Sequence, residues 1–166
     1  MISEQTATIA LERHELISAK DFDEVLAAVH AGLGRPDFGA FNRQLSALDD
    51  WQAFKHAVAK QAGSSGLLIF LELDLGSVVA RDPETPHYRI VRIIAGNHVT
   101  MESMVRTTPG AGAFAPVTLL IYERDDGVHL RYDTLTSAVY GELSAEAYRH
   151  AQDLDASVLS LLRASA

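Results

Sequence analysis

The stretch APVTLLIYERDDGVHLRYD, residues 115–133, has the clearest local pattern in the sequence. Pro116 lies where a strand can begin, and residues 117–123 are mostly apolar residues that favour strands. Asp126-Gly127 is a typical two-residue hairpin sequence, because glycine readily adopts the positive φ angles that such turns require. Residues 128–133 then return alongside the first strand. The stretch therefore predicts an antiparallel β-hairpin, and the rest of the chain is interpreted around it.

Three further segments predict strands that join this hairpin. The run LLIFLEL, residues 67–73, is apolar on both faces apart from Glu72, which is typical of a central strand. Residues 88–95, YRIVRIIA, alternate between the two faces and end before a glycine. Residues 6–16, TATIALERHEL, alternate as well, as expected of a half-buried strand.

Apolar residues at helical spacing occupy the segments between the strands. They predict a helix over 22–33, a helical region over 37–63 and a short helix over 98–106. Ser144 is a suitable N-cap for a long C-terminal helix. The sequence Gly-Ser-Ser-Gly at 63–66 is interpreted as a flexible joint that closes the helical region.

These elements predict an α+β fold. Without the helical insert and the short turns, their order is β-α-β-β-β-β-α. Strands that are mostly sequential and joined by hairpins form an antiparallel sheet, with the two long helices stacked on one face. A length of 166 residues fits one domain, so we predict a single domain over 1–166 with a helical insert at 37–63.

The reverse face of this sheet is predicted to be apolar too. If Ile69, Leu71, Val91 and Ile93 point toward the helices, the two-residue period of a strand sends another set to the opposite side: Leu68, Phe70, Ile90, Ile94, Leu120 and Tyr122. Exposed apolar patches of that size are rare on monomers. The insert, a second copy of the chain or an apolar ligand can cover it. We predict a homodimer in which the insert covers part of the sheet or extends the interface.

Composition excludes several classes of protein. The chain carries 14 Lys and Arg against 22 Asp and Glu, a net charge of −8, so neither nucleic acid nor an anionic membrane is a predicted partner. It has no cysteine, which excludes disulfides, thiol nucleophiles and Cys-type zinc sites. The N-terminus lacks the basic and apolar regions of a secretory signal, so a cytoplasmic location is expected.

Residues 94–133 resemble a known family. Ile94-Ala95-Gly96-Asn97-His98, a short Met-bearing stretch, APVTLLIYE at 115–123, Gly127-Val128 and Tyr132-Asp133 are together similar to the family named domain of unknown function 302. The resemblance covers about 6–34 and 67–160 and leaves 35–63 as an insertion. It implies a TATA-binding-protein-like α+β fold, β-α-β4-α, and frequent dimers, and it implies no established activity.

The chain departs from that family's pattern in places. His98 stands where a proline usually follows Gly-Asn, and the Cys or His positions of many relatives are not reproduced. A metal or thiol role in those relatives would therefore not transfer. The fold analogy does not imply DNA binding either, because a groove-reading face would have to be basic.

Few residues suggest chemistry, and each also has an ordinary structural interpretation. His98 follows Gly96-Asn97 at a strand-to-helix junction, where backbone amides can hold an anion, although Asn97 can equally be an N-cap and His98 a solvated residue. Glu72 in its apolar run must be paired, as with Arg89 or Arg92, or must face a cavity, and burial would raise its pKa.

The candidate residues fall into two groups. The acid-base candidates are Glu72, His98 and Glu123, none of them within a recognised catalytic motif. The ligand-binding candidates are Phe70, Asn97, His98, Tyr122 and Tyr132. No two of the seven histidines have the spacing of a zinc pair, so no metal site and no cofactor are predicted.

Three functions fit these observations. The first is a homodimeric small-molecule-binding or regulatory domain, with an apolar cavity between sheet and insert as the ligand site. The second is an enzyme on a small molecule that uses Glu72, His98 or Glu123 as its acid-base residue. The third is a protein-protein interaction module in which Phe41, Trp51 and Phe54 of the insert form an exposed surface.

Overall fold

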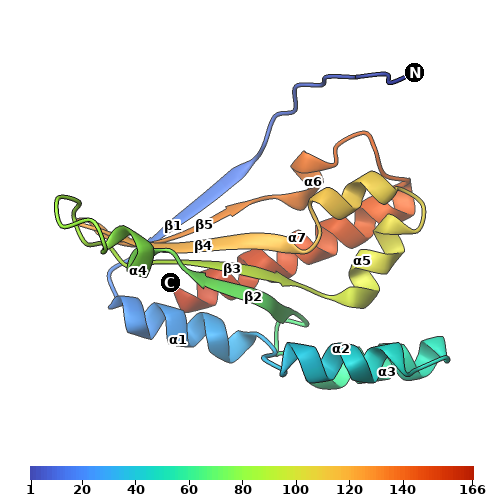
Figure 1. Cartoon of the computed structure of the whole chain (residues 1–166), viewed down its shortest axis with the longest axis horizontal. Coiled ribbons are helices and arrows are strands. Elements are labelled where there is room, and N and C mark those ends of the chain that lie inside the picture. Colours follow the sequence, from blue (N-terminus) through green and yellow to red (C-terminus); the bar gives the residue numbers. More distant parts are fainter.

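The computed structural model describes all 166 residues as one five-stranded antiparallel sheet with helices (Figure 1). In chain order the elements are β1 (Arg13–Ser18), α1 (Phe22–Gly32), α2 (Phe38–Ser46), α3 (Trp51–Gln61), β2 (Leu68–Asp74), α4 (Gly76–Val79), β3 (Ile90–Gly96), α5 (His98–Val105), the 3-10 helix η1 (Pro109–Ala113), β4 (Val117–Arg124), β5 (Gly127–Asp133), α6 (Leu135–Ala138) and α7 (Ala145–Ser165). Without the short helices and the insert, the order is the predicted β-α-β-β-β-β-α.

The sheet runs in the order β1-β5-β4-β3-β2, with every neighbouring pair antiparallel. The predicted hairpin is confirmed, but its two loop residues are Asp125 and Asp126 instead of Asp126 and Gly127, because Arg124 pairs with Gly127. Gly127 opens β5 with a φ of 136°, a conformation that only glycine adopts readily. Residues of α1 and α7 join residues of β3, β4 and β5 in one core of 25 buried side chains. The two long helices thus cover one face of the sheet, as predicted.

Strand β2 was predicted to be central, but it lies at the edge of the sheet. Its register shifts between Ile69, which pairs with Ala95, and Leu71, which pairs with Ile94, so Phe70 is an extra residue in the ladder. Such a bulge reverses the alternation beyond it. Leu71, predicted to face the helices, therefore lies on the opposite face and is 50% exposed.

Strand β1 is shorter than the predicted strand over 6–16. It begins at Arg13, which pairs with Asp133, the last residue of β5. Beyond that point the partner strand has ended, and only the backbone of Glu12 still bonds to Thr134 and Ser137. Residues 1–11 form no strand, and their N-terminal end extends away from the body of the protein (Figure 1). The length of the partner strand, not the apolar alternation, limits β1.

The insert consists of α2 and α3, capped by Asp37 and Asp50, whose side chains accept bonds from backbone amides in the first turn. It packs at the start of β2 in a small core of its own, made of Phe41, Leu45, Ala57, Val58 and Leu68. The joint predicted to be flexible is pinned: the Gly63 amide donates to the Leu67 carbonyl at 3.0 Å, and the Ser65 hydroxyl donates to the Gly32 carbonyl at 2.7 Å.

The reverse face of the sheet is only partly covered. Of the six apolar residues predicted there, Leu68 is buried in the core of the insert and Phe70 packs against that core. The other four, Ile90, Ile94, Leu120 and Tyr122, are half-buried on a face that neither long helix covers. We call this side of the sheet the open face.

Candidate functional site

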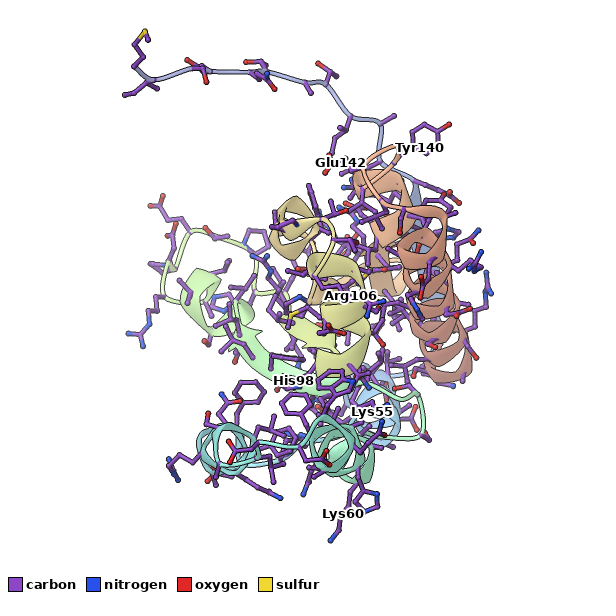
Figure 2. All side chains as sticks on the ribbon, turned by 90° about the vertical axis from the view of Figure 1, so that its right-hand side faces the viewer. Lys55, Lys60, His98, Arg106, Tyr140 and Glu142 are labelled. Carbon is purple, nitrogen blue, oxygen red and sulfur yellow. The ribbon has the colours of Figure 1, made fainter.

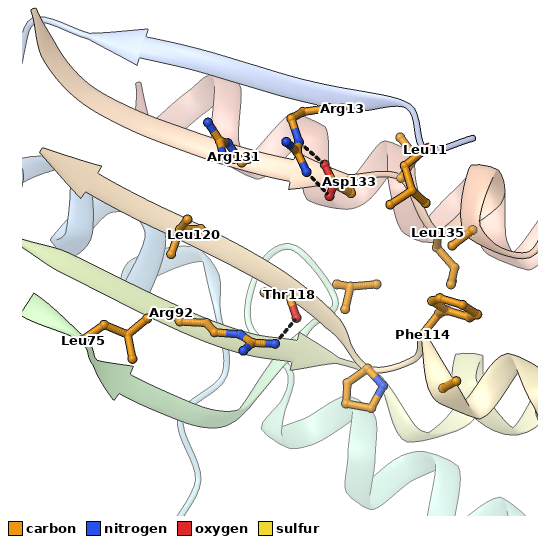
Figure 3. A pocket seen from close by; sticks show the side chains of 15 residues that line it. Leu11, Arg13, Leu75, Arg92, Phe114, Thr118, Leu120, Arg131, Asp133 and Leu135 are labelled. Atoms are coloured by element: carbon orange, nitrogen blue, oxygen red, sulfur yellow. Dashed lines mark hydrogen bonds and ion pairs between the residues drawn. The ribbon is translucent and has the colours of Figure 1, made fainter. Parts of the chain in front are cut away.

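A cavity of about 500 Å³ lies on the open face (Figure 3). Leu120 of β4 forms part of its floor, and Phe114, Leu135 and Ala138 belong to the segments around its end. Fifteen residues line it: Leu11, Arg13, Leu75, Arg92, Ala113, Phe114, Pro116, Val117, Thr118, Leu120, Arg131, Asp133, Thr134, Leu135 and Ala138. Its volume falls within the range of small-molecule sites, and its lining combines apolar side chains with a few polar ones, as in such sites.

Two of the three arginines in the lining are paired with carboxylates. Arg13 donates two hydrogen bonds to Asp133, at 2.6 and 2.7 Å. Arg131 donates to both carboxylate oxygens of Glu15, at 2.9 and 3.1 Å for the shortest bond to each. Both pairs join facing residues of β1 and β5, so the sheet register itself places each cation beside its anion.

The third arginine, Arg92 of β3, has no carboxylate partner. Its only side-chain hydrogen bond is a long one, 3.4 Å, to the hydroxyl of Thr118 on the neighbouring strand. Figure 3 shows its side chain lying across β3 and β4 toward that threonine. Arg92 was not among the sequence candidates. The sequence could have indicated it, because Arg92 is the one charged residue on a strand face that it shares with Ile90 and Ile94.

Tyr122 belongs to a polar cluster beside the cavity. Its phenol hydroxyl donates to Glu15 and accepts from Arg131 at 2.8 Å, and its ring stacks on His129 with 4.8 Å between centroids. Burial raises the pKa of the Glu15 carboxyl, but hydrogen bonds from Tyr122 and Arg131 outweigh it and hold that pKa below its ordinary value. Burial and the adjacent carboxylate raise the pKa of the Tyr122 phenol. Neither group is poised as a general base near neutral pH.

Three of the predicted ligand-binding residues come together away from this cavity. Asn97 caps α5, accepting from the amide of Val99 at 2.8 Å, and the next residue, His98, packs on Phe70 with ring centroids 4.8 Å apart. The rings of Phe38, Phe41 and Phe54 in the insert also lie within 6.2 Å of the His98 ring, and Figure 2 shows this imidazole beside the insert.

The environment of His98 is therefore apolar instead of solvated. Its Nδ1 is buried and has no hydrogen-bond partner, and burial lowers the pKa of its imidazole. An anion cannot use the amide of Val99 at this junction, because that amide already donates to the side chain of Asn97. His98 acts as a filler between the sheet and the insert.

Tyr132 is placed in the core, where it is 1% exposed. Its phenol donates to the Asp155 carboxylate of α7 at 2.5 Å. The same carboxylate accepts from the amides of Leu135 and Thr136, so it caps the start of α6. Burial and the nearby carboxylate raise the pKa of the Tyr132 phenol far above its ordinary value. This tyrosine holds α6 and α7 to the sheet and offers no group to a ligand at the surface.

The acid-base candidates lie apart from one another. Glu72 is paired with His30 of α1 at 2.6 Å, and not with Arg89 or Arg92, because the bulge at Phe70 turns it toward the helices. Glu123 lies near the other end of β4, where its backbone amide bonds to the carbonyl of Arg89. None of Glu72, His98 and Glu123 lines the cavity. The structure thus brings no pair of them together for proton transfer.

The interaction surface predicted on the insert is mostly buried. Phe41 of the insert is buried and Phe54 packs against the same small core, which leaves Trp51, 42% exposed, as the outward member of the predicted interaction surface. No group of three or more His, Asp or Glu side chains has an arrangement that would hold a metal ion. None of the helices has both the length and the apolar character needed to cross a membrane.

Comparison with known proteins agrees with this architecture. The model of the family described as domain of unknown function DUF302 matches residues 41–163, a span that begins inside the predicted insertion. A crystal structure described as an uncharacterized conserved protein DUF302 from Bacillus stearothermophilus superposes with a TM-score of 0.63 at 9% identity, over 93% of this chain and 98% of that one. That likeness shows the fold alone. No curated protein matches the sequence.

Proposed function

This chain belongs to the DUF302 family, whose description assigns no activity. From the geometry of its open face we propose that it is a homodimeric small-molecule-binding domain without classical catalytic groups. The observation that carries the proposal is the cavity of about 500 Å³ over β3, β4 and β5, large enough for a small ligand and lined by apolar and cationic side chains. The absence of any convergent acid-base pair in its lining supports binding over turnover.

This position differs from the one expected from the sequence. The space between the sheet and the insert is filled by the side chains of the small core and by His98, so it is a poor ligand site. The open face offers what that space lacks: half-buried Leu120 in the floor and buried Leu135 in the wall. A ligand that covers such apolar surface gains about 25 cal/mol for each Å² removed from water.

A neutral fluorescent probe tests the binding site. N-phenyl-1-naphthylamine, which brightens in apolar surroundings, should bind the protein saturably, and Leu120→Gln in the floor should weaken that binding by about tenfold. Ile17→Gln is the matched control, because Ile17 is 56% exposed on β1 and does not line the cavity. Binding that is not saturable, or that is equally strong in Leu120→Gln, would overturn the proposal.

The homodimer is supported by apolar side chains along the β2 edge of the open face. Leu71 and Leu73 are 50% and 36% exposed, and Val78 of α4 follows them in the chain. These side chains border the half-buried Ile94 on β3, which pairs with Leu71. A twofold contact joins the same patch on both copies, so the apolar strip of each copy is covered by that of the other.

Sedimentation velocity tests the dimer. The wild-type protein should sediment as a dimer at micromolar concentration, and Leu73→Lys should shift it to the monomer. Ile17→Lys serves as the control, because Ile17 is 56% exposed on β1, at the opposite edge of the sheet. A wild-type monomer at tens of micromolar, or a dimer that only Ile17→Lys disrupts, would rule out an interface along β2.

A further inference from the structure

The charges around the open-face cavity do not balance. Arg13, Arg92 and Arg131 line it, whereas the carboxylates bonded to them are only those of Asp133 and Glu15. One guanidinium is left without a counterion on a chain whose net charge is −8. The excess positive charge of the site is therefore a local feature, opposite in sign to the protein as a whole.

The uncompensated cation is Arg92. A guanidinium has five N–H donors in a fixed fork, and here only one of them is used, on a hydroxyl 3.4 Å away. Arg13 and Arg131 each bond both oxygens of a carboxylate. Arg92 thus offers to a ligand the same bidentate contact that its two neighbours make within the protein.

The surroundings of Arg92 set the rest of the ligand. In the sheet register Arg92 faces Leu120, so an anion on this guanidinium has an apolar side chain directly beside it. Toward the far wall stand buried Leu135 and half-buried Phe114. Thr134, only 4% exposed, also lines the cavity, and its Oγ1 has no hydrogen-bond partner.

We propose that the ligand of this cavity is an apolar molecule with a single carboxylate, which Arg92 binds through its guanidinium fork. This inference rests on the proposed function and names the class of ligand at the same site. One unpaired guanidinium matches one negative charge, and carboxylates suit the planar fork of arginine. A phosphate ester, with about two charges near neutral pH, would meet only half the cations it requires.

Decanoate and decanol form a matched pair of probes, equal in chain length and different only in the charged head. Each is titrated near neutral pH against the protein loaded with N-phenyl-1-naphthylamine, and displacement of the fluorophore gives its affinity. We expect decanoate to bind about tenfold or more tightly than decanol, the advantage expected of a charge-assisted hydrogen bond. In Arg92→Met this advantage should disappear, while the affinity for decanol stays within about twofold.

Two further variants separate charge from folding. Arg149→Met removes an exposed arginine on α7, on the covered side of the sheet, and should leave the preference for decanoate intact. Arg92→Lys keeps the positive charge without the fork and should retain part of the preference. If Arg92→Met does not fold by circular dichroism, Arg92→Gln takes its place.

The outcomes distinguish the two proposals. If decanol and decanoate bind equally, or if decanoate keeps its advantage in Arg92→Met, the carboxylate assignment is wrong and the apolar site stands. If neither compound nor the fluorophore binds, the proposed function fails, and the ligand class fails with it. Loss of both affinities together in Arg92→Met would show a packing role for Arg92 and would also overturn the assignment.

Discussion

The two faces of the sheet are made of the same strands but differ in how they are stabilised. On the helix-covered face, Ile93, Leu119 and Leu130 are fully buried against α1 and α7. On the open face, ion pairs between β1 and β5 stand beside half-buried apolar residues such as Ile94 and Leu120. Stability therefore comes mainly from one face, which leaves the other free to bind.

Paired charges explain how the open face tolerates water. Glu15 accepts hydrogen bonds from Arg131, Tyr122 and His129, so this part of the face consists of polar groups that bond to one another. The half-buried apolar residues of this face, such as Ile94 and Leu120, lie on β3 and β4. The division between the faces predicts very different costs for neighbouring substitutions.

The largest effect should come from Ile93 and Ile94, two isoleucines side by side in β3 that point to opposite faces. Ile93→Ala creates a cavity in the main core and should lower the free energy of unfolding by about 3 kcal/mol. Ile94→Ala removes a half-buried side chain and should cost about 1 kcal/mol. Urea unfolding of both variants at low protein concentration measures the difference.

This pair also reports on assembly. At a concentration where copies associate, Ile94→Ala should cost more, because a second copy would cover this side chain. Equal costs for the two variants at every concentration would mean that the open face is permanently covered, and the comparison between faces would not hold.

The buried carboxylate of Asp155 should have the next largest effect. Asp155→Ala leaves the phenol of Tyr132 and the amides of Leu135 and Thr136 without an acceptor, and should cost about 2 kcal/mol. Asp153→Ala, two residues away on the exposed side of α7, is the control and should cost less than about 0.5 kcal/mol. Thermal or urea unfolding compares them; a similar loss in both would show that the capping of α6 contributes little.

Much of this fold could be predicted from local patterns. The β4-β5 hairpin follows from Asp126-Gly127 and the strand sequences around it, and α7 follows from its cap at Ser144 and its apolar stripe. The edge position of β2 could not be predicted in this way. Its start is buried by the insert, so Leu68 has the burial expected of a central strand, and the bulge at Phe70 has no signature in the sequence.

The site was harder to predict than the fold. Phe70, Asn97 and His98 do meet, because Gly96-Asn97 marks a real strand-to-helix junction. The cavity lies elsewhere because its residues come from five separate segments, and only the sheet order brings β3, β4 and β5 into one floor. Whether Arg92 had a carboxylate partner depended on which way Glu72 turned, and a shift of one residue in register decides that.

His98 allows a test at the one corner of the open side that the insert covers. Burial lowers the pKa of its imidazole below the ordinary value of 6.5, so the folded state resists protonation that the unfolded chain accepts. Stability should therefore fall as pH drops below about 6.5, since the unfolded state then binds more protons. His98→Phe removes this contribution, and its advantage over the wild type should grow between about pH 7 and pH 5.

Unfolding in urea across that pH range measures the slope for both proteins. At neutral pH His98→Phe should be at least as stable as the wild type, because it also removes the unpartnered Nδ1. His56→Phe, an exposed histidine on α3, controls for the other histidines and should keep the wild-type slope. Parallel pH profiles for His98→Phe and the wild type would show that this corner is open to water.

The smallest effect should come from the ion pair between Arg13 and Asp133 on the open face. Arg13 holds the pKa of the Asp133 carboxyl below its ordinary value, so the pair stabilises the fold above that value and loses its contribution as pH falls through the lowered pKa. Because the pair is open to solvent, Arg13→Met should lower Tm by no more than about 2 °C near neutral pH, and by less in high salt. In acid the wild type and the variant should converge, since protonated Asp133 no longer attracts the guanidinium. A loss comparable to that of Ile93→Ala would show that the charges of the open face hold the sheet together, and would leave Arg92 as one member of a structural network instead of a free site for an anion.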